Sequence, residues 1–169
     1  MSASQPATHG HAQPDPSQDA LQLLAAEHRE VKAMFQQYDK LAEAGGRGDE
    51  RMLLASQICV ALTLHAQVEE EILYPAASEA LPHDGDIVDE AYVEHASAKS
   101  LVAQIKTMTS DQPLFDAKVK VLGEYIDHHV KEEENELFPK LRKSGLDLKA
   151  MGGRIAQRRM QLMAMPEPS

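Results

Sequence analysis

The chain has 169 residues, a formal net charge of −10 and a hydrophobic fraction of 43%. This length corresponds to about one domain and allows a sizeable core. The negative charge argues against nucleic acid or an anionic membrane surface as a partner, because both would repel the protein. The chain has a single cysteine, Cys59, which cannot form an internal disulfide. Nothing therefore points to an oxidising compartment.

The beginning of the chain has neither the basic residues nor the apolar stretch of a secretory signal. No apolar run reaches the roughly 18 residues that a membrane-spanning helix needs. We therefore expect a cytoplasmic protein without a membrane partner. Residues 1–17 are rich in Pro, Ser, Gln and Ala, which predicts a disordered tail. His9 and His11 of this tail are interpreted as part of a solvated spacer, with a stray metal ion as the alternative.

Four long helical patterns follow, each with apolar residues three and four positions apart. The first runs over about 19–44 and the second over about 49–79. The third begins at 84 or 86, and the fourth begins near 110, with Pro113 in its first turn, and ends at 144–145. Because short connections make neighbouring helices antiparallel, we predict an all-α fold, an up-down four-helix bundle over residues 18–145.

The remaining segment, residues 146–169, is predicted to be a short C-terminal helical extension. It has a helical pattern over about 146–163 and a basic patch that contains Lys149, Arg154, Arg158 and Arg159. We expect this helix to pack across one end of the bundle. A helix that docks a partner is the alternative.

The sequence repeats itself in two halves. Glu27-His28 with Lys32 corresponds to Glu94-His95 with Lys99. In the same way, the segment HAQVEEEILYP, which begins at His65, corresponds to the segment HVKEEENELFP, which begins at His129. Each half thus supplies one histidine from its first helix and an H-x-x-x-E pair from its second. This symmetry predicts a site with two equivalent halves.

The repeated polar residues lie on the apolar stripes of their helices. A histidine and a glutamate four residues apart share one helical face. A buried carboxylate without a partner is very costly. Salt bridges from Lys32 and Lys99 would satisfy the two carboxylates but leave four converging histidines unexplained. Bound metal ions account for both kinds of group, and the predicted ligands are His28, His65, Glu69, His95, His129 and Glu133.

Imidazole and carboxylate without thiolate favour iron, manganese or zinc. Iron is preferred over zinc, because a structural zinc site is closed and tetrahedral and holds one ion.

His128 points about 100° away from His129 on a helix and is interpreted as a residue outside the ligand set. Glu27, Glu94, Tyr38, Tyr92 and Tyr125 are candidates for orienting the histidines. The other acids near the stripes (Glu70, Glu71, Glu132, Glu134 and Glu136) are interpreted as a solvated face. Cys59 is interpreted as a core side chain.

At these residues, over about 19–143, the chain resembles the hemerythrin-like family, the His-His-Glu cation-binding domain. The resemblance implies two iron ions with a bridging oxo or hydroxo group. His28 and His65 would then serve one iron, His95 and His129 the other, and Glu69 and Glu133 would bridge them. Oxygen-carrying hemerythrins have two histidines one turn apart on the third helix. Here the positions one turn from His95 hold Ala91 and Lys99.

One iron therefore lacks a ligand that water, Tyr92, Glu94 or another side chain would replace. This departure moves the expected function away from oxygen carriage. We expect a non-haem di-iron protein that binds or reacts with a small diatomic or peroxide ligand: dioxygen, peroxide or nitric oxide. Whether it is an enzyme that consumes peroxide or nitric oxide stays open, as does any protein partner. The alternatives are a non-catalytic iron- or oxygen-sensing module and, less favoured, a zinc or manganese hydrolase.

Overall fold

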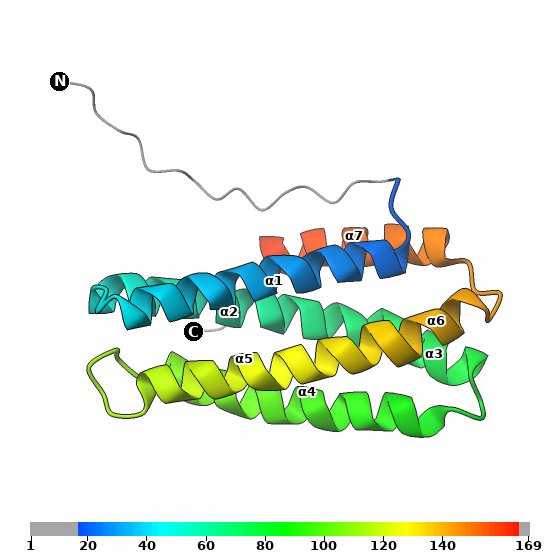
Figure 1. The fold of residues 1–169 in the computed structure, drawn as a ribbon. Coiled ribbons are helices and arrows are strands. Elements are labelled where there is room, and N and C mark those ends of the chain that lie inside the picture. Colours follow the sequence, from blue (N-terminus) through cyan, green and yellow to red (C-terminus); the bar gives the residue numbers. More distant parts are fainter. Residues whose placement is uncertain (1–16, 166–169) are drawn as a thin grey trace.

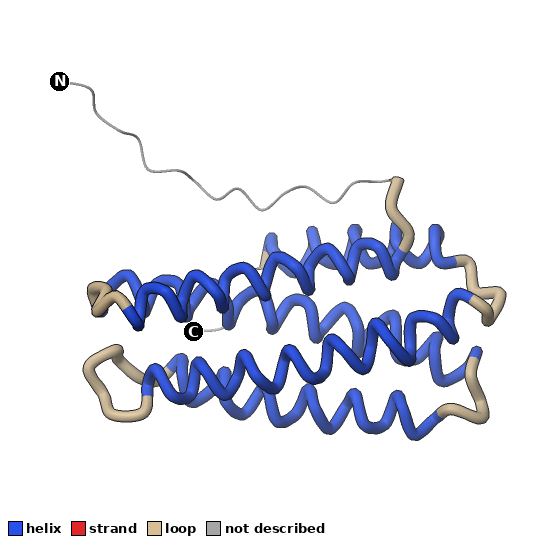
Figure 2. Tube along the Cα trace, viewed as in Figure 1, coloured by secondary structure: helices blue, strands red, loops and turns tan. Residues whose placement is uncertain are grey.

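The computed structural model describes residues 17–165, and these residues form helices joined by loops, without a strand (Figures 1 and 2). The prediction of an all-α protein is confirmed. Of the predicted N-terminal tail, all but Ser17 lies outside the described residues, and so do residues 166–169 of the C-terminal extension.

Four long helical rods lie lengthwise side by side, and successive connections between them lie at opposite ends (Figure 1). The first is α1 (Ala20–Glu43) and the third is α4 (Gly85–Lys106). The second is continuous from α2 (Gly48–Val68) through the π-helical turn η1 (Glu69–Leu73) to α3 (Tyr74–Ala80). The fourth repeats this pattern with α5 (Phe115–Glu132), η2 (Glu133–Leu137) and α6 (Phe138–Arg142).

Two helix starts illustrate how local chemistry sets these boundaries. Asp19 accepts a hydrogen bond from the Gln22 backbone N–H at 2.9 Å, and the Gln22 side chain accepts one in return from the Asp19 N–H at 3.0 Å. This capping box begins α1 where the sequence predicted it. The predicted start of the fourth helix near 110 is wrong, because Leu114 has a φ of 73°. A right-handed helix cannot pass through that conformation, so α5 begins only at Phe115.

The site lies between two apolar clusters that fill the two ends of the protein. One cluster contains Leu24 of α1 and Val68 of α2. The other contains Val31 of α1 and Leu62 of α2. On each of these rods the predicted metal-binding histidine falls between the two clusters, and the same order holds on α4. The polar side chains are therefore enclosed from both ends by packed apolar side chains.

The C-terminal helix, α7 (Leu148–Ala164), lies lengthwise beside α1 (Figure 1). It packs against α1, α2 and η1. The prediction that it packs across one end of the bundle is therefore wrong. A Cβ on Gly152 would lie 2.9 Å from the backbone N of Ala20, so the missing side chain lets the two helices approach this closely. The sequence did not indicate this contact, because it joins segments more than 100 residues apart.

The rod Gly48–Ala80 is long and apolar enough, by length and composition alone, to cross a membrane. Half of its most apolar window is buried inside the protein, as in the core helix of a water-soluble protein. A single helix of this kind is a weak indication of a membrane span. The expected absence of a membrane partner stays a prediction.

Candidate metal centre

Six side chains converge at the middle of the four rods, and they are those that the sequence singled out. All are buried, with at most 9% of each residue exposed: His28 on α1, His65 on α2, Glu69 on η1, His95 on α4, His129 on α5 and Glu133 on η2. The H-x-x-x-E spacing brings each glutamate one turn beyond its histidine, as predicted. Polar groups buried this deeply need partners.

One half of the site is formed by His28 and His65. Their Nε2 atoms lie 3.0 Å apart. Oε1 of Glu69 lies 2.8 Å from Nε2 of His65, and Oε1 of Glu133 lies 3.3 Å from Nε2 of His28. Two imidazole nitrogens and two carboxylate oxygens therefore face one point.

The other half is formed by His95 and His129, whose Nε2 atoms lie 3.2 Å apart. Oε2 of Glu69 lies 3.0 Å from Nε2 of His95, and Oε2 of Glu133 lies 3.2 Å from Nε2 of His129. Each glutamate thus presents one oxygen to each histidine pair. This is the arrangement by which a carboxylate bridges two cations.

Each histidine has its outer nitrogen, Nδ1, next to a carboxylate. The four pairs are His28 with Glu134 at 2.8 Å, His65 with Glu27 at 2.6 Å, His95 with Glu70 at 3.3 Å and His129 with Glu94 at 3.3 Å. Each carboxylate accepts a hydrogen bond from the Nδ1–H group, so the neutral ring presents the lone pair of Nε2 to the centre. The pairs fix which nitrogen of each ring can bind a metal.

Two of these carboxylates were among the predicted orienting groups, and two were missed. Glu27 and Glu94 precede the first histidine of each half, whereas Glu70 and Glu134 follow the predicted bridging glutamates. The last two were interpreted as a solvated face, but the doubled glutamate in both copies of the repeat was a signal for them.

The three tyrosines predicted to orient histidines lie elsewhere. Tyr38 donates to Asp116 at 2.5 Å, Tyr92 packs its ring against that of Tyr74, and the side chain of Tyr125 is exposed.

Within residues 17–165, two carboxylate oxygens of the site are left without a hydrogen bond. Oε1 of Glu69 and Oε1 of Glu133 are buried and accept no hydrogen bond from any described residue. Both oxygens face Nε2 atoms of histidines. In each neutral ring the proton is on Nδ1, which donates it in a hydrogen bond to an outer carboxylate, so Nε2 has only a lone pair to present. Lone pairs that converge in this way repel one another unless a cation lies among them. The residues present therefore fit a bound metal ion.

The electrostatics of the histidines give the same result. Burial alone would lower the pKa of His28, but the Glu133 and Glu69 carboxylates outweigh it and raise the pKa to about 9. At His129 the same two carboxylates again outweigh burial, and they raise its pKa to about 11. Burial would raise the pKa of Glu69, but the neighbouring histidines hold it well below its usual range. The centre thus stabilises positive charge, whether a proton or a metal ion supplies it.

A tyrosine that the sequence analysis did not consider lies in the second half of the site. The hydroxyl of Tyr74 lies 2.8 Å from Oε2 of Glu133 and 3.0 Å from Oε2 of Glu69, and its single proton can be donated to either carboxylate. It also lies 3.1 Å from Nε2 of His95 and 3.4 Å from Nε2 of His129. Burial and the two carboxylates raise the pKa of Tyr74 well above its usual value. This hydroxyl therefore lies in the half of the site that His95 and His129 form.

A π-helical turn brings Tyr74 into the site. In an α-helix, a residue five positions after Glu69 would lie about 140° away from it. The Tyr74 N–H bonds to the Glu69 carbonyl, five residues back, and the wider turn aligns the two side chains. The other half has the same turn but ends in Phe138, which stacks on His28 at a ring distance of 6.0 Å. The difference between Tyr74 and Phe138 in the repeat was the available signal.

The lysines do not pair with the two buried glutamates. Lys99 contacts Glu70 at 2.6 Å, and Lys32 lies 3.9 Å from Asp127. The salt-bridge alternative is therefore wrong in this structure. His128 points away from the centre, with 68% of its side chain exposed, and lies 3.1 Å from Glu132.

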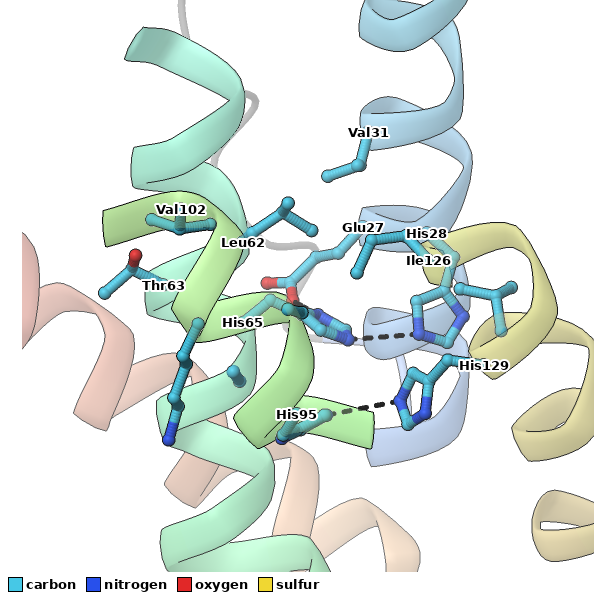
Figure 3. A pocket seen from close by; sticks show the side chains of 14 residues that line it. Glu27, His28, Val31, Leu62, Thr63, His65, His95, Val102, Ile126 and His129 are labelled. Atoms are coloured by element: carbon cyan, nitrogen blue, oxygen red, sulfur yellow. Dashed lines mark hydrogen bonds and ion pairs between the residues drawn. The ribbon is translucent and has the colours of Figure 1, made fainter. Parts of the chain in front are cut away.

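A small cavity lies against the four histidines (Figure 3). Its volume is about 40 Å³, room for about three water molecules. Apolar side chains also line the cavity, among them Val31, Leu62, Val102 and Ile126. The centre thus has space beside it for a ligand of a few atoms in a mostly apolar setting.

An all-helical protein with a buried cluster of histidines and glutamates that can hold metal belongs to the class of helical cation-binding domains. The family model of the Hemerythrin HHE cation binding domain matches residues 19–141. The chain therefore belongs to the hemerythrin HHE family. The resemblance inferred from the repeated motifs is confirmed.

Relatives support the fold along most of the chain. An uncharacterized protein of Mycobacterium tuberculosis is 23% identical over 151 residues, which cover 88% of this chain and 89% of that protein. The crystal structure of a Hemerythrin HHE cation binding domain-containing protein from Mycobacterium kansasii has a TM-score of 0.71 at 19% identity. It covers 85% of this chain and 86% of its own, and this likeness shows the fold. A DNA nickase of a Nostoc species is 38% identical over 86 residues, 51% of this chain but only 24% of the nickase.

Proposed function

We propose that this chain is a non-haem di-iron protein, an antiparallel four-helix bundle whose centre binds or reacts with dioxygen, peroxide or nitric oxide. The observation that carries the proposal is that each buried glutamate presents one oxygen to each histidine pair. His28 and His65 would hold one iron, and His95 and His129 the other. Glu69 and Glu133 would bridge them. A bridging oxo or hydroxo group stays a prediction from the family resemblance.

The donor set supports iron, since imidazole and carboxylate without thiolate suit this metal and its redox change. When bound, iron would supply electrons to a small oxidant. The chain's own residues would hold the metal ions, fix the four Nε2 atoms and enclose the ligand. Four aliphatic side chains give the cavity a mostly apolar lining. Space for only a few atoms favours a small ligand over an organic substrate.

We infer that Tyr74 takes the place of the absent histidine in the second half. Its hydroxyl already lies within about 3 Å of both bridging carboxylates. A nearby cation would lower the phenol's pKa, since positive charge favours the ionised form. Tyr74 would then be an oxygen ligand to the iron held by His95 and His129. With Tyr74 and Phe138 at equivalent places, the two irons would have unequal surroundings.

DNA nicking is not part of this proposal. The match covers only 24% of the nickase, and the net charge of −10 opposes binding to DNA.

Metal analysis and visible spectra of the purified protein test the proposal. We expect two equivalents of iron and absorption bands that change on addition of peroxide, nitric oxide or a reductant. Glu69→Ala and Glu133→Ala should lose metal, whereas His128→Ala, an exposed residue of the same region, should retain it. Two equivalents of iron without any spectral response would refute the reaction with small oxidants. Equal metal loss from all three variants would refute the ligand assignment.

A further inference from the structure

We propose that Arg159 of α7 is a positioning residue of the metal centre, which acts through Glu27 on His65. The inference rests on the proposed two-metal function. It extends the centre beyond residues 19–141, the part of the chain that matches the family. It also implies that the two histidine pairs are not held equally firmly, because only one pair has a histidine whose carboxylate partner is bound by a largely buried arginine.

The helix that carries Arg159 is fixed to the body of the protein. Asp147 caps it by accepting a hydrogen bond from the Ala150 N–H at 3.0 Å. Met151 and Ile155 are buried in the apolar cluster that also contains Leu24 of α1. Gly152 lets the helix lie directly on the start of α1. The position of Arg159 is therefore set by packing over the preceding turns of α7.

A continuous chain of contacts leads from Arg159 to the centre. The guanidinium Nη1 forms an ion pair with Oε1 of Glu27, and the other oxygen, Oε2, lies 2.6 Å from Nδ1 of His65. Only 17% of the Arg159 side chain and 11% of the Glu27 side chain are exposed. Glu27 also lines the cavity beside the histidines (Figure 3). A buried carboxylate shared in this way has little freedom to turn away from His65.

The other three orienting carboxylates have weaker or more exposed support. Glu70 contacts Lys99, whose side chain is 54% exposed. Glu94 lies 3.9 Å from the exposed His128. Glu134 has no cationic partner other than His28 in the described part of the chain. Among residues 17–165, His65 is thus the one site histidine whose carboxylate is held by a largely buried guanidinium.

The physical consequence concerns His65 alone. Without Arg159, Glu27 would be a buried carboxylate with one uncompensated oxygen, a costly state that favours rotation towards water. His65 would then lose the acceptor that fixes its ring and its Nδ1 proton. Loss of such an outer partner typically lowers metal affinity about 10- to 100-fold. The effect should fall on the metal that His28 and His65 hold.

The chain offers a matched control in the neighbouring residue. Arg158 contacts the exposed Glu71 through Nε at 2.6 Å and Nη2 at 3.1 Å. Its substitution also removes an ion pair between α7 and η1 but touches no residue that orients a histidine. Arg159→Gln therefore removes the contact with Glu27, the carboxylate beside His65, whereas Arg158→Gln leaves that contact in place. Arg159→Lys keeps the charge without the planar fork and should restore part of the effect.

We would measure metal release to a chelator from the iron-loaded full-length protein. In Arg159→Gln we expect one of the two equivalents to leave about 10- to 100-fold faster, with the other unchanged. Arg158→Gln should match the wild type. Identical release from Arg159→Gln and Arg158→Gln would overturn the inference. Equal acceleration of both equivalents would also overturn it, because that pattern reports general loosening.

A second measurement needs no metal. In chelator-treated protein with ¹⁵N-labelled histidine, the Nδ1 proton of His65 should exchange with water faster in Arg159→Gln, while that of His129 is unchanged. An unchanged His65 signal would overturn the positioning role. Wild-type protein that holds fewer than two equivalents of metal would refute the proposed function. The His65 signal would then decide the role of Arg159 by itself.

Discussion

Oε1 of Glu134 lies 2.8 Å from Nδ1 of His28, although 106 residues separate the two along the chain. The same relationship recurs in the other half, where Glu70 lies beside Nδ1 of His95. In both copies of the repeat the first glutamate of the doubled pair faces the centre. The second orients a histidine of another rod. The two adjacent glutamates of each copy thus have different roles: one faces the centre and the other orients a histidine.

Replacing Glu134 should weaken the site without removing a ligand. Glu134→Gln keeps the shape of the side chain but accepts a weaker hydrogen bond from the Nδ1–H group of His28, since the carboxylate charge is lost. We expect metal affinity to fall by about 10- to 100-fold, as for other outer-shell partners of metal-bound histidines. Chelator competition against iron would measure the change.

Glu136→Gln is the control for this variant, because Glu136 is on the same turn and exposed. It removes the same charge, so a general electrostatic effect would act equally in both. If both variants bind iron equally well, Glu134 has no orienting role.

Tyr74→Phe should change the spectrum more than the fold. The phenol ring fills a fully buried space, which phenylalanine also fills, so the helices should stay packed. We expect the variant to lose any tyrosinate-to-iron absorption band and to bind one of its two irons more weakly. Resonance Raman spectra of the loaded protein would check for the phenolate signal. A wild-type protein without that signal, or a variant that keeps it, would contradict the assignment.

The six central residues could be predicted because α-helical periodicity is enough to align them. Each lies three or four residues from buried or half-buried apolar neighbours on its helix. Tyr74 could not be found in this way, because a π-helical turn changes the periodicity just where the site is built. The pairing of Glu134 with His28, and of Arg159 with Glu27, depends on how the rods pack. Such contacts cannot be read from one helix at a time.

The metal-free protein should become less stable as pH rises above neutrality. The folded-state pKa is about 9 for His28 and about 11 for His129, both above the usual value of 6.5. A raised histidine pKa contributes stability that is fully present below about pH 6.5. This stability is lost as pH rises through the folded value. For His28 alone the contribution is on the order of 3 kcal/mol.

Denaturant unfolding of chelator-treated protein between about pH 6.5 and about pH 9 would measure this loss. The iron-loaded protein is the comparison, because bound metal replaces the protons on Nε2. We expect it to lose much less stability over the same range. Stability of the metal-free protein that holds constant or increases with pH would show that the histidines are not paired with Glu69 and Glu133 as described.

Cys59 should act only as a core side chain. It is 1% exposed, and burial raises the pKa of its thiol to about 11. Because the thiolate is the reactive form, we expect native protein to resist alkylation at about pH 8, whereas unfolded protein should react readily. Cys59→Ala should keep its metal content and spectrum and lose about 1–2 kcal/mol of unfolding free energy. Rapid alkylation of the native protein, or an altered iron spectrum in the variant, would instead give this thiol a redox role.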